Sequence, residues 1–222
     1  MNLAALIRQY RLAANDMVEP YFVDDETLTD LFNEAEQEAV IRARLIHEND
    51  DASVCQIEVE PGKASYPLHT ALYELTSIRF QKDGDDRYQR IDLKSTEDLD
   101  RITPKWRERS GSPLYAVQDD KSLRLVPKPD YDGDLYLEGY RLPLADMLNP
   151  DDEPEINQAH HRHLYHWVLH RVFSIPDAET FDPSRAQAAE NAFEQYFGIR
   201  PDSDLRRTTR EDEPQTVKGF FV

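Results

Sequence analysis

The apolar residues of this chain repeat with a helical period near both ends and with a strand period in between. Up to residue 52, and again from residue 151 to 198, they recur every three or four positions, as on one face of a helix. Between residues 53 and 150 apolar and polar residues alternate, which is typical of half-buried strands. This order predicts an α+β fold: a helical bundle, made of an N-terminal and a C-terminal helix pair, with an inserted antiparallel β-sandwich or barrel-like domain.

The N-terminal part, residues 1–52, predicts two helices. The first begins near Leu3 and ends near Asn15, and the second runs from a capping residue, Asp24, to about His47. The apolar stripe of the second helix is regular, and three glutamates are predicted to lie outside it: Glu34, Glu36 and Glu38.

The central part, residues 53–150, predicts a series of short strands joined by turns. The predicted strands are residues 54–60, 72–80, 87–93, 114–118, 122–126 and 135–141. Ser95, with Asp98 at the spacing of a capping box, predicts a short helix between two of them. Cys55 alternates with apolar neighbours and is expected to be a buried strand residue. As the sole cysteine, it excludes an intramolecular disulfide.

The C-terminal part, residues 151–198, predicts two more helices. The first is expected to include Pro154 in its first turn, where the missing N–H has no helical partner to lose. The second is capped by Asp182 and ends at Gly198. Beyond that glycine the periodicity is lost, so residues 199–222 are predicted to form an extended tail with an apolar end.

The net charge constrains the function. The chain has 44 acidic and 26 basic residues, a formal net charge of −18, and it lacks the basic patch of a protein that holds nucleic acid. The excess acid lies mainly in residues 1–50, net −7, and residues 151–198, net −6, whereas the tail is neutral. No apolar run approaches the roughly 18–20 residues that cross a bilayer. We therefore expect a soluble protein made in the cytoplasm, with no membrane partner.

Five of the seven histidines lie between His160 and His170. His163, His166 and His170 share one flank of the predicted helix, so a metal-dependent hydrolase that uses this helix is one hypothesis. The other interpretation is a polar flank beside the apolar face of Trp167, because the helix has no HEXXH motif. The chain also has no phosphate loop, dinucleotide fingerprint or GXSXG elbow. We predict no catalytic residue, no metal and no cofactor.

Several segments, taken in their order along the chain, are similar to the sequence pattern of one protein family. They are the acidic cap and helix of residues 24–35 (DDETLTDLFNEA), Pro61-Gly62, Tyr66-Pro67-Leu68, Gly111-Ser112-Pro113-Leu114-Tyr115 after Trp106, and residues 123–130 (LRLVPKPD). With a helical pair after the β region, this order resembles that of the head-to-tail adaptor (connector) proteins of tailed bacteriophages.

The resemblance implies a structural virion protein rather than an enzyme. Copies would form a ring, dodecameric to match a portal, in the neck between head and tail, and DNA would pass through its channel without specific binding. The implied partners are the portal protein, tail or nozzle and neck proteins, and further copies of this chain. The β domain would contact the tail or neighbouring subunits. The family's C-terminal segments reach into the portal, which assigns portal binding to five tail residues: Val217, Lys218, Phe220, Phe221 and Val222.

The sequence leaves alternatives to the adaptor hypothesis. The apolar tip, residues 220–222, either anchors a partner, as aromatic residues often do, or packs back onto its own domain. Another neck, tail-tube or head-completion component would fit the same pattern. Outside the virion classes, a β-sandwich that binds a ligand through an exposed aromatic residue such as Trp106 is a further hypothesis, besides the hydrolase.

Overall fold

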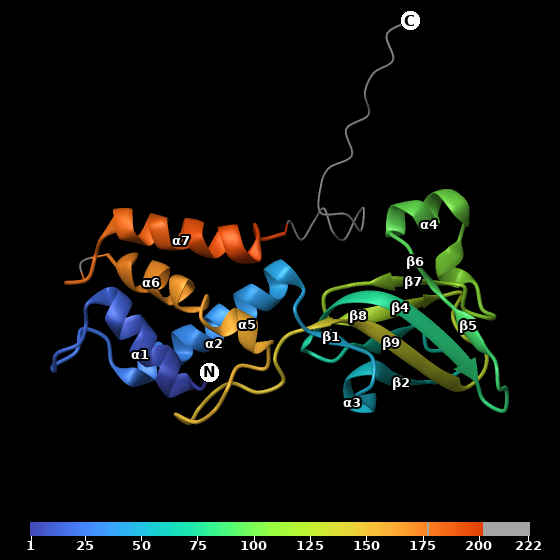
Figure 1. Cartoon of the computed structure of the whole chain (residues 1–222). Coiled ribbons are helices and arrows are strands. Elements are labelled where there is room, and N and C mark those ends of the chain that lie inside the picture. The colour runs from blue at the N-terminus through green and yellow to red at the C-terminus, as the bar shows by residue number, and fades with distance from the viewer. Residues whose placement is uncertain (177, 202–222) are drawn as a thin grey trace, which may run out of the picture. The chain divides into compact units, whose positions relative to one another are not determined.

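The computed structural model of the chain describes residues 1–176 and 178–201. Most of these residues form two compact units (Figure 1). Met1–Ile46 and Arg141–Arg200 make the helical unit, and His47–Tyr140 make the body of the β unit. The chain thus leaves the helical unit, builds the β unit and returns. The α+β class predicted from the sequence is confirmed.

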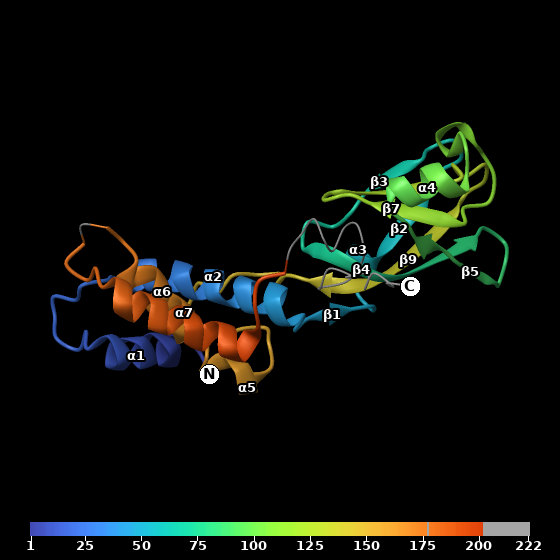
Figure 2. The same cartoon turned by 90° about the horizontal axis from the view of Figure 1, so that it is seen from above.

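The helical unit contains α1 (Leu3–Ala14), α2 (Asp25–Ala43), α5 (Gln158–His161), α6 (Tyr165–Phe173) and α7 (Pro183–Phe197). Helix α6 is central, because it packs against α1, α2 and α7 (Figure 1 and Figure 2). The apolar stripes meet there and bury large side chains completely, among them Tyr10, Phe32 and Phe193. Each buried side chain of this size contributes about 1.5–3 kcal/mol. This packing joins the N-terminal and C-terminal parts of the chain.

Side chains cap these helices at the predicted residues. The Asp24 carboxylate accepts a hydrogen bond from the Thr27 N–H at 2.7 Å. The Asp182 carboxylate accepts hydrogen bonds from two backbone N–H groups in the first turn of α7. At its other end, α7 stops at Gly198, whose φ of 90° favours glycine. These predictions are confirmed because a cap depends on residues within one turn of each other.

The end of α2 differs from the prediction. The helix stops at Ala43 rather than near His47, because Arg44 adopts a left-handed conformation with a φ of 52°. The chain then forms β1 (His47–Glu48), which pairs antiparallel with β9 (Gly133–Arg141). The last residues of the predicted helix are therefore used in sheet pairing, a long-range contact that periodicity does not reveal.

The helix predicted from Pro154 is wrong in its first part, whereas its second part occurs as α6. Residues 154–157 are not helical, and the helical region that follows is divided into α5 and α6. The reason is a carboxylate on α2: Glu36 accepts hydrogen bonds from the backbone N–H of Glu155 at 2.6 Å and of Ile156 at 3.3 Å. These hydrogen bonds hold the segment outside a helix until α5 begins.

Two of the glutamates predicted to lie outside the apolar stripe of α2 are buried. Glu36 is 2% exposed and Glu38 is 6% exposed. Glu38 forms ion pairs with Arg42 at 3.0 Å and with Arg200 at 2.9 Å, which offset part of the cost of removing its charge from water. The prediction was wrong for both residues, because a glutamate that gains partners on folding can occupy the packed face of a helix.

The β unit is built on two open sheets. The first has the order β1–β9–β4 (Leu72–Lys82)–β5 (Tyr88–Arg90), and β2 (Gln56–Val59) also pairs with β9. The second has the order β3 (Ser65–Pro67)–β8 (Ser122–Val126)–β7 (Tyr115–Gln118)–β6 (Asp92–Leu93). The predicted barrel-like form is wrong, because neither sheet closes on itself. Strands of both sheets contribute to one apolar core, which includes Tyr66, Leu75, Ile78, Phe80, Leu123, Leu125, Leu135 and Leu137.

The strand predicted over residues 87–93 is divided between the two sheets. Strand β5 pairs with β4, whereas β6 pairs parallel with β7, and the buried Ile91 lies between them in the chain. A parallel pair needs a long crossover, which here contains α4 (Thr96–Ile102) and the 3-10 helix η1 (Trp106–Glu108). Ser95 caps α4 as predicted. The prediction of a wholly antiparallel domain is wrong at this pair and at an isolated parallel bridge between Ser110 and Lys128.

Cys55 is buried as predicted, at 4% exposure, but it does not belong to a strand. It ends the short helix α3 (Ala52–Cys55), and β2 begins only at the next residue. The Asp51 side chain caps this turn by accepting a hydrogen bond from the Ser53 N–H at 2.9 Å. A local cap thus converts the first residues of the predicted strand into a helical turn.

Candidate interaction surfaces

The five residues predicted to bind a portal, Val217, Lys218, Phe220, Phe221 and Val222, lie outside the described residues. Their role therefore stays a prediction. The described surface of the two units carries four features of its own: a group of histidines, a polar cavity, an apolar end of the helical unit and a basic segment of the β unit.

The histidines of residues 160–170 pack mainly against α7. The His163 ring stacks on the Tyr196 ring, with centroids 3.5 Å apart and planes inclined by 12°. His160 Nδ1 lies 3.2 Å from the Tyr196 hydroxyl, and His170 Nδ1 lies 3.2 Å from the carbonyl of Ala186. Residues 1–176 and 178–201 contain no group of three His, Cys, Asp or Glu side chains placed to hold a metal ion. These contacts fit the interpretation of the histidines as a packed polar flank.

Burial lowers the pKa of His163 and of His166. Desolvation is the main cause for both rings; the charges of Arg162 and His160 act in the same direction on His163, and the charge of His163 does so on His166. Both shifts favour the neutral imidazole in the folded chain. As the pH falls, the unfolded state takes up these protons first, so acidification destabilises the fold.

Replacing His163 with alanine is expected to lower the free energy of unfolding by about 1 kcal/mol, because the stacked pair with Tyr196 is lost. Chemical denaturation at neutral pH measures this change. His163→Phe is the matched control, since it keeps a ring on Tyr196 and cannot be protonated. The His163→Phe variant should retain most of the wild-type free energy of unfolding. Below the ordinary histidine pKa of about 6.5, its free energy of unfolding should fall less than that of the wild type. Wild-type stability in the alanine variant would show that the stacking contributes nothing.

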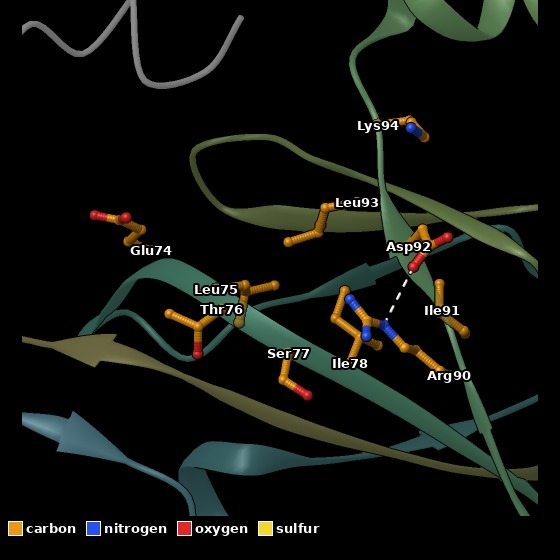
Figure 3. A pocket seen from close by; sticks show the side chains of 10 residues that line it. All are labelled: Glu74, Leu75, Thr76, Ser77, Ile78, Arg90, Ile91, Asp92, Leu93 and Lys94. Carbon is orange, nitrogen blue, oxygen red and sulfur yellow. Dashed lines mark ion pairs between the residues drawn. The ribbon is translucent and has the colours of Figure 1, made fainter. Parts of the chain in front are cut away.

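A polar cavity of about 540 Å³ lies beside β4 (Figure 3). One wall is residues 74–78 of β4, and the other is residues 90–94, where the chain passes from β5 to β6. Arg90 Nε lies 3.3 Å from the Asp92 carboxylate, and both side chains are exposed. The cavity results from the change of sheet between β5 and β6, and its lining carries both signs of charge.

Trp106 is not an exposed aromatic residue. It is 3% exposed, and its indole N–H donates a hydrogen bond to Asp100 Oδ1 at 2.8 Å. Together with Leu99, Val117 and Val126 it forms a small separate core. The hypothesis of ligand binding through Trp106 is therefore wrong, because the crossover between β6 and β7 folds the ring into its own core.

The helical unit exposes apolar side chains at one end. The α1–α2 connection and the α6–α7 connection both lie at this end (Figure 1 and Figure 2). Arg185, near the start of α7, donates a hydrogen bond to the carbonyl of Ala13, near the end of α1, at 3.2 Å. This hydrogen bond links the two connections. Six apolar residues here are between 48% and 79% exposed, and we call them the apolar end: Leu12, Met17, Val18, Phe22, Ile175 and Phe181.

Arg11 holds the α1–α2 connection in place. It is 6% exposed, and its guanidinium lies 2.9 Å from the Asp16 carboxylate and 2.5 Å from that of Asp25. The guanidinium also lies over the Tyr21 ring, 3.6 Å from its centroid. Asp16, only 3% exposed, accepts a further hydrogen bond from the N–H of Phe22 at 3.1 Å. A buried ion pair therefore fixes the conformation of this connection.

The β unit carries a basic segment, residues 101–109, which spans the end of α4 and η1. Glu108 is its one acidic residue, and Ile102 is 54% exposed. Its four basic residues are all exposed: Arg101, Lys105, Arg107 and Arg109. Two of these side chains pair with carboxylates of α4, Arg101 with Asp98 at 3.8 Å and Arg107 with Asp100 at 2.6 Å. Among the described residues, Lys105 and Arg109 form no ion pair.

The apolar end and the basic segment are surfaces of the kind through which proteins contact one another. The sequence matches the model of the SU10 adaptor protein family over residues 1–217, so the chain belongs to this family of phage head-tail adaptors. The family is structural and generally non-enzymatic, and its members are virion proteins that contact other virion proteins. No curated protein matches the sequence. In the described residues, no helix is both long and apolar enough to span a membrane.

Proposed function

We propose that this chain is the head-to-tail adaptor of a tailed bacteriophage. Its copies form a dodecameric ring under the portal, connect the capsid vertex to the tail and surround part of the DNA channel. The observation that carries the proposal is the family match, which spans both units and most of the tail. The apolar end and the basic segment support it, because a closed ring of identical subunits needs two different contact surfaces on each subunit.

The helical unit is the proposed channel wall. Residues 1–50 carry a net charge of −7 and residues 151–198 carry −6. An acidic wall repels the phosphates of DNA, whereas a basic wall would accumulate attraction over many phosphates and hold the DNA in place. Glu36 and Glu38 add nothing to this wall because both are buried. The exposed carboxylates of the unit supply the repulsion.

Deleting residues 202–222 is expected to weaken binding to purified portal rings about tenfold or more, because aromatic anchors often dominate the energy of an interface. The portal protein is the first partner proposed for the ring, and tail or nozzle and neck proteins are the others. Co-sedimentation with portal rings measures the affinity. Phe220→Ser with Phe221→Ser tests the apolar tip alone, and Gln215→Ala with Thr216→Ala is a matched control in the same segment.

The outcomes separate the parts of this proposal. Equal binding by the full chain and the truncated chain would remove the assignment of portal binding to Val217, Lys218 and residues 220–222, while leaving the adaptor role intact. A full chain that binds tail-tube or head-completion proteins, but no portal ring, would instead identify another component of the neck.

A further inference from the structure

The apolar end of the helical unit leaves six apolar side chains in contact with water. Val18 is 79% exposed, Leu12 is 62% and Phe22 is 57%. Monomeric proteins expose single apolar residues freely, but a group of large ones gathered at one place marks a contact surface. The two connections that carry the group lie at the same end of the helical unit in both views (Figure 1 and Figure 2).

The α1–α2 part of this surface is also preorganised. The Arg11–Asp16 ion pair fixes the α1–α2 connection, and the Arg185–Ala13 hydrogen bond links α7 to the end of α1. Apolar side chains on a rigid connection lose little freedom when a partner covers them, so the contact they make is stronger for the same buried area.

Exposed carboxylates lie close in sequence to residues of the apolar end, where Arg185 is an exposed basic residue. Glu19 lies next to Val18 in the α1–α2 connection, and Glu179 lies two residues before Phe181 in the α6–α7 connection. Asp24, at the start of α2, is exposed as well. A partner that covers the apolar residues therefore brings its own rim against these carboxylates, and a basic rim is favoured.

The basic segment of residues 101–109 has the complementary properties. It places Ile102, 54% exposed, among four exposed basic side chains, and two of those, Lys105 and Arg109, have no carboxylate partner within the described residues. Copies of a chain with a net charge of −18 repel one another in general. A contact between copies therefore needs a locally basic surface, and residues 101–109 provide one.

We propose that the apolar end of the helical unit binds the basic segment of a second copy of this chain. The contact is heterologous, so each copy uses one surface toward each neighbour, and its repetition gives a ring where the rotation between neighbours closes after a full turn. This inference rests on the proposed function in one respect: the contact is the one between neighbouring subunits of the proposed ring. The apolar residues supply affinity, whereas Glu19 and Glu179 of one copy select Lys105 and Arg109 of the next.

Charge reversal on either surface tests this contact. Lys105→Glu with Arg109→Glu makes both surfaces acidic, and Glu19→Lys with Glu179→Lys makes both basic. Each variant alone should self-associate at least about tenfold more weakly than the wild type, as measured by sedimentation velocity of the full chain. An equimolar mixture of the two variants should restore association, because each acidic surface then meets a basic one. Added salt should weaken association of the wild type.

All four substituted residues are exposed, so both variants should retain the circular dichroism spectrum of the wild type. Arg87→Glu with Lys121→Glu reverses two exposed basic residues elsewhere on the β unit and is the matched control. A wild-type chain that stays monomeric up to its solubility limit overturns the proposal, as does a mixture that fails to restore association. The portal-binding assay is separate: if portal binding persists while this contact fails, the inference falls and the proposed adaptor function stands.

Discussion

Replacing Arg11 with alanine is expected to destabilise the helical unit by about 3–5 kcal/mol, the largest effect of any single substitution considered for this chain. The change leaves Asp16, which is 3% exposed, without the guanidinium that lies 2.9 Å from its carboxylate. A buried carboxylate without a charge partner is strongly unfavourable. Arg11 also spans to Asp25 at the start of α2, so its loss frees the α1–α2 connection. Urea denaturation, followed by the helical circular dichroism signal, measures the change.

Two further variants serve as controls, one for the loss of an arginine side chain in itself and one for the case in which Arg11→Ala does not fold. Arg8 is exposed on the same helix, and Arg8→Ala should change the free energy of unfolding by less than about 0.5 kcal/mol. Arg11→Lys keeps one positive charge but cannot present a planar fork to two carboxylates, so its stability should be intermediate even where the alanine variant fails to fold. If Arg11→Ala is no less stable than Arg8→Ala, the ion pair does not organise this connection.

Replacing Glu36 with glutamine is expected to stabilise the protein at alkaline pH by as much as about 3 kcal/mol. Burial raises the pKa of Glu36 from 4.5 to about 7; the N–H groups of Ile156 and Glu155 oppose this shift, and the charges of Glu155 and Asp146 add to it. The carboxyl group is therefore protonated more readily in the folded chain than in the unfolded chain. Its contribution to stability is complete below pH 4.5 and is lost as the pH rises through about 7.

Glutamine keeps an oxygen that accepts both backbone hydrogen bonds, and it has no charge to bury. The difference between the Glu36→Gln variant and the wild type should therefore be small at acidic pH and should grow with pH, as measured by urea denaturation across this range. Glu34→Gln is the control on the same helix, because Glu34 is half-buried and pairs with the exposed Arg171 at 3.1 Å. Parallel stability curves for the Glu36→Gln variant and the wild type would rule out a raised pKa.

Features of the fold that depend on neighbouring residues were predictable from the sequence. Asp24, Ser95 and Asp182 cap helices as predicted, because a cap needs only a side chain and the next turn. Strand β8 and its hairpin partner β7 also occur where the alternation of apolar and polar residues predicts strands. Local patterns thus established the α+β class and most of the elements.

Features that depend on distant residues were not predictable. The first part of the helix expected from Pro154 fails because Glu36, far away in sequence, binds the backbone of residues 155 and 156. The 87–93 strand divides because its two halves pair with different sheets. Both outcomes require the tertiary structure, which a single pattern of apolar residues does not contain.

The candidate surfaces were predictable only in part. The tail residues 217–222 stand out in the sequence because an apolar tip follows a polar segment. The apolar end was missed, since residues 17–23 have no period and indicate only a connection. Its apolar composition was the available signal. The basic segment of residues 101–109 is visible as a local reversal of charge in an acidic chain, but its exposure depends on the burial of Trp106 beneath it.

The most direct test of the central claim is a reconstruction, at side-chain resolution, of the neck of the virion that contains this chain. We expect a ring of copies between the portal and the tail, with the helical unit toward the DNA channel and residues 217–222 against the portal. A neck without this chain, or copies located on the capsid surface or at the distal end of the tail, would contradict the adaptor function.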